Sequence, residues 1–168
     1  STRPVSQALA AIPADPAARE RRRRQVLGGG FRVREGTRAP EVTLVGMGVI
    51  MPELLQAAGE LEAAGTAVDV VCLTSPDLLF RALQARRGLF DGEDGVLDEL
   101  FPGERRAPMV SVLDGHPHTL SFLAAIDPAP LACLGVQDFG QSGDVQDLYR
   151  HFGIDADTIV GAALDLIG

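Results

Sequence analysis

The feature that most constrains this chain is an alternation, from residue 41 onward, of short apolar runs with longer amphipathic segments. A short apolar run bounded by turn residues is typical of a buried strand, and apolar residues spaced three and four apart are typical of a helix that covers a sheet. Such an alternation favours right-handed crossovers and a parallel sheet covered on both faces. We therefore predict an α/β fold, a three-layer α/β/α sandwich with a mostly parallel sheet of about five strands, one of them an antiparallel edge strand. The central strands are predicted at 42–45, 68–73, 109–113 and 131–134, and helices are predicted to begin near 52, 76, 117, 144 and 155.

Residues 1–40 have a different pattern. Their first half is rich in proline and alanine, which is typical of a connector. Asp15-Pro16 then indicates a helix start, with Asp as N-cap, and this helix is expected to end at the glycine run 28–30. Phe31–Arg34 alternates apolar and charged residues, which favours the edge strand. We assign 1–40 to a linker and an arginine-rich helix, and 41–168 to one α/β domain.

Two further segments are expected at the surface. Residues 88–108 are rich in glycine, proline and acidic residues, so a surface excursion with about one helical turn is predicted. Arg21–Arg24 spread round the first helix, so at least one guanidinium must face protein. A solvated helix and a contact to a neighbouring domain or subunit both remain open for it.

Composition excludes several classes of function. The net charge of −8 argues against nucleic acid or a membrane surface as a partner. All 15 cationic side chains are arginine, which excludes a Schiff-base lysine and the lysine of a phosphate-binding loop. No apolar stretch is long enough to cross a bilayer, no signal peptide opens the chain, and both cysteines lie in apolar runs. We expect a soluble cytoplasmic protein, and the start at Ser1 is compatible with a fragment of a longer polypeptide.

Gly46-Met47-Gly48 stands between a predicted strand and a predicted helix, where a dinucleotide-binding fingerprint would lie. The third glycine of that fingerprint would fall at Met51, and the ribose-binding acid would fall at Leu73-Thr74. A tight turn is therefore the simpler interpretation. Gly46 and Gly48 remain candidates for a ligand loop.

Asp114-Gly115-His116-Pro117-His118 is the densest polar cluster and follows a predicted strand. Ligands of open α/β sheets bind at this edge, and two imidazoles with a carboxylate can bind a metal or transfer a proton. Against this, Pro117 separates the histidines and no third ligand follows at metal-site spacing. Asp114, His116 and His118 are candidates, beside the interpretation of a loop that caps the next helix. No serine or cysteine stands in a nucleophile motif.

The tail LGVQDFGQSGDVQDLYRHFGIDADTIVGAAL places a glycine, a Phe-Gly pair and a serine before one helix, and Phe-x-Ile-Asp before the last. It closely resembles the end of the transketolase and homodimeric pyruvate dehydrogenase family. VTLVGMGVIMPELLQAAGELEAAGTAVDVVCLTSPDLL resembles the same C-terminal domain, and STRPV with the arginine-rich helix resembles the exit from the preceding domain. The resemblance gives a structural role to Gly135, Asp138, Phe139, Gly140, Ser142 and Asp155.

The resemblance implies a non-catalytic C-terminal domain. Enzymes of this family hold thiamine diphosphate and a divalent metal, Mg²⁺, between two upstream domains of a dimer. Their Gly-Asp-Gly motif with a later Asn has no counterpart here, since Gly92-Glu93-Asp94-Gly95 does not match it. No catalytic residue, cofactor site or metal site is therefore expected in this chain. The 88–108 segment is most like that of the homodimeric pyruvate dehydrogenase, whereas the loop DGHPHTL differs from the loop that those enzymes usually have.

The expected partners are the upstream thiamine diphosphate-binding domains, a homodimer partner and an acyltransferase core. The expected role is to brace the dimer and to offer docking surface, within an α-keto acid dehydrogenase or a transketolase-like enzyme. Two alternatives stay open. One is a free-standing small-molecule-binding α/β module that uses loops 46–51 and 114–118, and the other is an interaction module of a multienzyme complex.

Overall fold

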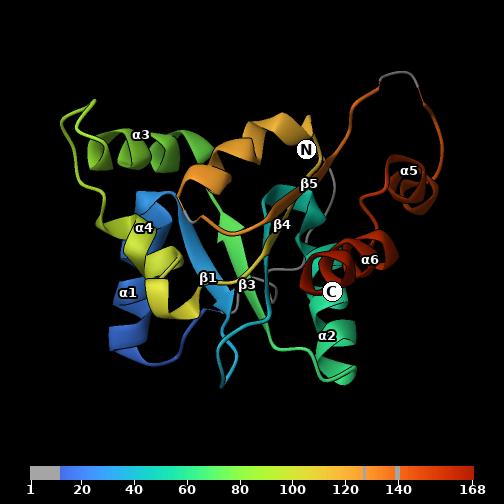
Figure 1. Ribbon diagram of the computed structural model, residues 1–168, viewed down its shortest axis with the longest axis horizontal. Helices are drawn as coiled ribbons and strands as arrows, with labels where there is room; N and C mark the ends of the chain where they lie inside the picture. Colours follow the sequence, from blue (N-terminus) through green and yellow to red (C-terminus); the bar gives the residue numbers. More distant parts are fainter. Residues whose placement is uncertain (1–11, 127, 139–140) are drawn as a thin grey trace.

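The computed structural model describes residues 12–126, 128–138 and 141–168 (Figure 1). Within these residues, one sheet has the strand order β1-β3-β2-β4-β5. β1 pairs antiparallel with β3, and the other pairings are parallel. The α/β class, the mostly parallel five-stranded sheet and the antiparallel edge strand are therefore confirmed. The strands are β1 (Gly30–Arg34), β2 (Val42–Gly46), β3 (Val68–Leu73), β4 (Met109–Leu113) and β5 (Leu131–Gly135).

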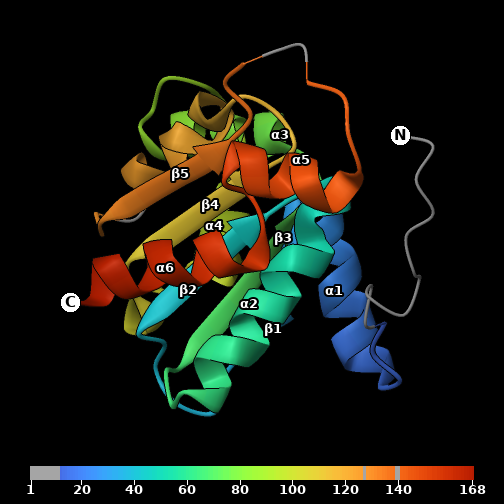
Figure 2. The same cartoon turned by 90° about the vertical axis from the view of Figure 1, so that its right-hand side faces the viewer.

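Helices cover both faces of the sheet, as Figures 1 and 2 show. The first face carries α2 (Met51–Ala63), α5 (Val145–Phe152) and α6 (Ala156–Ile167), with the 3₁₀ turn η2 (Gly48–Ile50) leading into α2. The second face carries α3 (Pro76–Arg86), α4 (Gly95–Leu100) and the 3₁₀ helices η3 (Gly103–Arg105) and η4 (Pro117–Ala125), while α1 (Pro16–Gly28) lies beside β1.

The two faces have separate apolar cores because neighbouring residues of a strand point to opposite sides. In β4, Val110 and Val112 belong to the core beneath α2 and α6. Met109 and Leu113 belong to the core beneath α3, α4 and η4. All four side chains are buried, which explains why this strand is a continuous apolar run with a single serine.

The first helix begins where the sequence predicts. Asp15 accepts a hydrogen bond from the Ala18 backbone N–H at 2.7 Å, and Pro16 is the first helical residue. The Arg22 guanidinium lies 4.4 Å from the centre of the Phe31 ring and donates to the Arg32 carbonyl oxygen at 3.0 Å. At least one of the four consecutive arginines thus faces protein, as expected.

The predicted surface excursion at 88–108 is partly wrong. Leu97 and Leu100 of α4 are fully buried in the second core. Arg86 of α3 holds this helix in place through ion pairs to Asp94 at 2.7 Å and to Asp98 at 2.8 Å. The helical turn was predicted, but the acidic composition gave no sign that its two leucines, three residues apart on one face, are buried.

η4 lies where a helix was predicted, but it is a 3₁₀ helix. Its buried residues are spaced three positions apart: Pro117, Leu120 and Leu123. A period of three matches the 3₁₀ helix, in which residues i and i+3 lie above one another. This winding places all three side chains toward the core.

Candidate functional site

The two candidate loops lie side by side at the carboxyl edge of the sheet. β2 and β4 are neighbouring parallel strands, with Gly46 opposite Val112. The chain leaves β2 for α2 on one face and leaves β4 for η4 on the other. Open α/β sheets bind ligands at such a topological switch point. The structure therefore brings Gly46, Gly48 and the 114–118 loop to the same region.

Gly46 and Gly48 have different physical roles there. A Cβ at Gly46 would lie 2.8 Å from Leu54 Cδ2, so a glycine is needed for α2 to approach the strand. Gly48 has a φ of +69°, a left-handed conformation that glycine adopts without strain. Met51, where a dinucleotide-binding motif would need glycine, is a buried first residue of α2. These contacts account for the glycines by packing and turn geometry.

The 114–118 loop is attached to the end of β5. The Val136 backbone N–H donates to the Gly115 carbonyl oxygen at 2.8 Å. At Gly135 a Cβ would collide with that oxygen and would lie 2.9 Å from the Pro117 nitrogen. Gly135 of the tail motif is therefore the residue that lets the histidine-bearing loop pack on its neighbouring strand.

His116 and His118 are brought together, although Pro117 separates them in sequence. Their Nδ1 atoms are 3.1 Å apart, and their rings meet edge to face with centres 5.0 Å apart. Both rings are exposed, whereas Pro117 is buried beneath them. Asp114 is also exposed at the start of the loop.

The remaining residues of the tail motif have local roles where they are described. Asp155 is buried, precedes α6 and accepts a hydrogen bond from the Thr158 hydroxyl. Asp138 and Ser142 are exposed, and the next helix is capped by Asp144, which accepts from the Gln146 N–H at 3.0 Å. Phe139 and Gly140, to which the resemblance gives a structural role, lie outside the described residues.

A buried ionic cluster lies at the opposite edge, where β3 begins. Asp69 is almost fully buried and accepts hydrogen bonds from Arg32, from Arg105 and from the Gly36 backbone N–H. Burial by itself raises the pKa of the Asp69 carboxyl, but the hydrogen bonds from Arg105 and Gly36 and the charge of Arg32 bring the pKa below its ordinary value. Asp69 is thus an anchor for β1 and for the segment around Arg105, far from any ribose-binding position.

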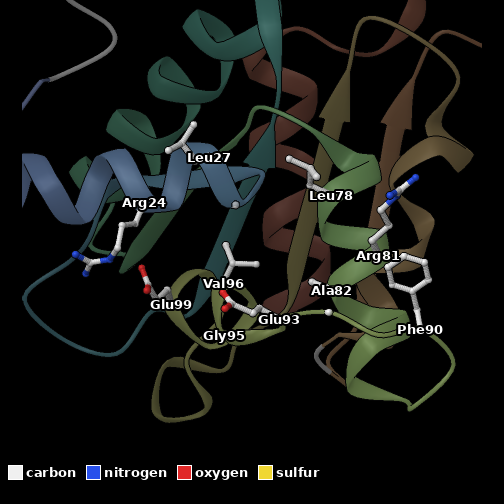
Figure 3. Close-up of a pocket in the computed structure, with 12 residues that line it drawn as sticks. Arg24, Leu27, Leu78, Arg81, Ala82, Phe90, Glu93, Gly95, Val96 and Glu99 are labelled. Carbon is white, nitrogen blue, oxygen red and sulfur yellow. The ribbon is translucent and has the colours of Figure 1, made fainter.

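A cavity of about 510 Å³ opens between α1, α3 and α4 (Figure 3). Its apolar lining includes Leu27, Leu78 and Phe90, whose exposed fractions are 64%, 41% and 51%. Figure 3 shows Arg24 and Glu99 at one side, and at the other Arg81, whose guanidinium lies 5.6 Å from the Phe90 ring centre. The sequence analysis did not predict this site. An apolar residue, Leu27, directly before the glycine run was the one feature of the sequence that could have indicated it.

A family model described as the transketolase-like C-terminal domain matches residues 29–155. The chain belongs to this family. The match begins just before β1, so it includes the antiparallel edge strand of the sheet. It also spans both candidate loops and the tail motif up to Asp155. The resemblance found in the tail is therefore confirmed for the transketolase C-terminal domain.

Relatives in this family are whole transketolases. The chromosomal transketolase of Cupriavidus necator is 32% identical over 161 residues, which are 96% of this chain and 21% of the relative. Transketolase 2 of Escherichia coli is 26% identical over 145 residues, 86% of this chain and 20% of the relative. The chain thus spans about a fifth of the length of the curated relatives it matches.

Solved structures show the same fold. The transketolase from Leishmania mexicana matches with a TM-score of 0.64 and 20% identity, over 86% of this chain and 18% of that one. A split-gene transketolase, described as an inactive beta4 tetramer, matches with a TM-score of 0.57 and 24% identity, over 83% of this chain and 42% of that one.

Across the described ranges, none of the helices is both long and apolar enough to span a bilayer.

Proposed function

We propose that this chain is the non-catalytic C-terminal domain of a thiamine diphosphate-dependent enzyme that transfers two-carbon units. The observation that carries the proposal is the family match over 29–155, in a chain that spans about a fifth of its transketolase relatives. The relatives' names favour transketolase chemistry over the α-keto acid dehydrogenase reaction that the length of 88–108 suggested. They give no support to an acyltransferase core as a partner.

The described residues do not fit the cofactor of the parent enzyme. Across 12–126, 128–138 and 141–168, no three His, Cys, Asp or Glu side chains gather where they could hold a metal ion. Burial raises the pKa of the Cys72 thiol to about 11, although Arg22 opposes the shift, which favours the thiol over the thiolate at neutral pH. We assign thiamine diphosphate and its Mg²⁺ to the upstream domains, as the resemblance to the transketolase family implies. Both cysteines are free thiols, which suits a cytoplasmic enzyme.

The contact with those domains is assigned to the apolar cavity between α1, α3 and α4. Exposed Leu27, Leu78 and Phe90 form an apolar surface with arginine and glutamate at its rim, and contiguous apolar surface of this kind is typical of interaction sites. α1 contributes Leu27 and is the described helix nearest in sequence to the segment that resembles the exit from the preceding domain. The rest of the polypeptide thus covers this apolar surface, and through this contact the domain braces the dimer. In this assignment, residues 12–40 pack with the α/β domain. The N-terminal boundary of the domain then lies near the start of α1.

Two measurements test the proposal. The first is the intact mass of the native polypeptide in its source cells, detected with an antibody to this domain. A product several times larger than 17.7 kDa is expected, and a product near 17.7 kDa would contradict the assignment to a multidomain enzyme.

The second measurement uses Leu27→Asp in the parent polypeptide, with Leu164→Asp as the matched control on the opposite face. Both leucines are exposed, at 64% and 46%, so neither change disturbs the core. Leu27→Asp is expected to weaken dimerisation in sedimentation and to lower ketol transfer, whereas Leu164→Asp leaves both unchanged. Equal behaviour of the two variants would refute the role of the cavity.

A second candidate function rests on the switch point. The loops after β2 and β4 lie side by side where α/β proteins bind small molecules, which favours a free-standing binding module as the alternative. In this candidate, Gly46 and Gly48 line the ligand loop beside the 114–118 loop. Saturable micromolar binding of a nucleotide, lost in Gly48→Val, would support it over the transketolase assignment.

A further inference from the structure

The transketolase assignment gives no role to the histidine pair at the switch point. Nδ1 of His116 and Nδ1 of His118 are 3.1 Å apart. The His118 backbone N–H also donates to His116 Nδ1, at 3.3 Å. His116 Nδ1 thus accepts from the His118 backbone, and which of the two ring nitrogens donates to the other depends on the tautomers of the rings.

The backbone that carries both rings is held at several points. Gly115 before the pair is attached to Val136 at 2.8 Å, and Pro117 between the rings is buried. The Thr119 N–H donates to the His116 carbonyl oxygen at 3.1 Å, and the Ser121 hydroxyl donates to the His118 carbonyl oxygen at 2.7 Å. A fixed backbone lowers the entropy lost when the two imidazoles converge on one ligand.

The spacing of the nitrogens is that of two ligands on one metal ion. With metal–nitrogen bonds of about 2.05 Å, nitrogens at a right angle are about 2.9 Å apart, and nitrogens at the tetrahedral angle are about 3.35 Å apart. The observed 3.1 Å lies between these values. The distance between the two nitrogens therefore suits two imidazoles on one metal ion, which would replace the hydrogen bond that His116 Nδ1 accepts from the His118 backbone N–H.

We propose that His116 and His118 form a binding site for a divalent transition-metal ion, separate from the Mg²⁺ of the parent enzyme. Imidazole nitrogen favours Cu²⁺, Ni²⁺ and Zn²⁺, whereas Mg²⁺ takes oxygen ligands. Within the described segments no third His, Cys, Asp or Glu completes a set, so water fills the other coordination positions. These positions are open to a small anionic ligand from solvent, since both rings are exposed.

The site is tested by titrating the tag-free 168-residue chain with Cu²⁺, Ni²⁺, Zn²⁺ and Mg²⁺ in a calorimeter. One ion per chain is expected, with Cu²⁺ bound more tightly than Ni²⁺ or Zn²⁺ and with no heat from Mg²⁺. His116→Asn and His118→Gln each remove one imidazole, and Asn at 116 retains the ability to cap η4. Loss of even an outer-shell partner weakens metal binding about 10–100-fold, so each variant is expected to weaken Cu²⁺ binding at least about tenfold.

The chain supplies its own control in His151, on the last turn of α5 beside Phe152. His151→Gln is expected to bind Cu²⁺ as the wild type does, and circular dichroism confirms that each variant is folded. The proposal is overturned by wild-type binding no tighter than that of the double variant, by unchanged binding in both single variants, or by an equal loss in His151→Gln. None of these results bears on the transketolase assignment, which rests on different measurements.

Discussion

The carboxylate of Glu53 accepts a hydrogen bond from the backbone N–H of Ala156 at 3.1 Å, although the two residues are 103 positions apart. Glu53 is in the first turn of α2, and Ala156 is the first residue of α6. The first N–H groups of a helix have no partner within the helix, and a negative charge near them is favourable. Glu53 of α2 thus caps α6, and this hydrogen bond connects the last helix of the chain to α2.

Replacing Glu53 by alanine is expected to destabilise the chain by about 1–3 kcal/mol, because a buried N–H loses its acceptor. Urea unfolding followed by circular dichroism measures the change. Glu60→Ala, at an exposed position of the same helix, is the control and is expected to change stability by less than about 0.5 kcal/mol. Equal effects of the two substitutions would show that the α6 cap contributes nothing.

Gly135→Ala tests the contact between β5 and the histidine-bearing loop. Its methyl group would meet the Gly115 carbonyl oxygen and the Pro117 ring, which are backbone and ring atoms that cannot rotate away. Overpacking of this kind costs about 1–3 kcal/mol, which thermal unfolding measures. Gly59→Ala, in α2 with no atom within 4 Å of the new Cβ, is the matched control and is expected to stabilise by about 0.5–1 kcal/mol. Stabilisation by both substitutions would contradict the close packing at Gly135.

Asp69→Asn is expected to destabilise the chain by about 3 kcal/mol or more at pH 7, because Arg32 and Arg105 lose a buried counter-charge. The loss should depend on pH. The pKa of Asp69 is lower in the folded chain than its ordinary value, so its contribution is complete above about pH 4 and is lost as the pH falls through the folded value. The difference in unfolding free energy between wild type and variant is therefore expected to shrink from pH 6 to pH 3. A constant difference over that range would contradict the lowered pKa.

Asp147→Asn is the control for this experiment. Asp147 pairs with Arg150 at 3.0 Å, but both side chains are exposed, at 72% and 64%. Exposed pairs contribute about 0–1 kcal/mol. A loss as large as that of Asp69→Asn would show that the effect comes from charge alone and not from the buried cluster.

Ser111→Ala is expected to leave stability unchanged or to raise it by up to about 1 kcal/mol. The Ser111 hydroxyl in β4 is buried and has no hydrogen-bond partner, so it loses its bonds to water on folding without replacing them. Ser121→Ala is the comparison, because that hydroxyl donates to His118. Destabilisation by Ser111→Ala in urea unfolding would indicate an unseen partner, such as a bound water.

The fold could be predicted from the sequence because each local pattern depends only on residues that are close together in the chain. Apolar runs such as Val70–Leu73 need burial on both faces, which a covered parallel sheet provides. Asp15 caps a helix as expected, since its side chain accepts from the Ala18 N–H, and Ser75 caps α3 in the same way by accepting from Leu78. The tail motif identified the family for a different reason, because it matches residues rather than physical patterns.

The 88–108 segment shows where local patterns fail. Composition indicated a surface location, but Leu97 and Leu100 are buried against other elements of the second core. The apolar cavity was missed for the same reason, since Leu27, Leu78 and Phe90 come from three separate segments.

The sequence by itself determined the alternation of strands and helices, the antiparallel edge strand and membership in the transketolase C-terminal family. Tertiary structure alone decided which distant residues meet: Glu53 with Ala156, Asp69 with Arg105, and Gly135 with the loop that aligns His116 and His118. The physical reason is that propensity and periodicity act within a few residues, whereas caps, ion pairs and ligand sites depend on how strands are ordered in the sheet. The order β1-β3-β2-β4-β5 put the two candidate loops side by side.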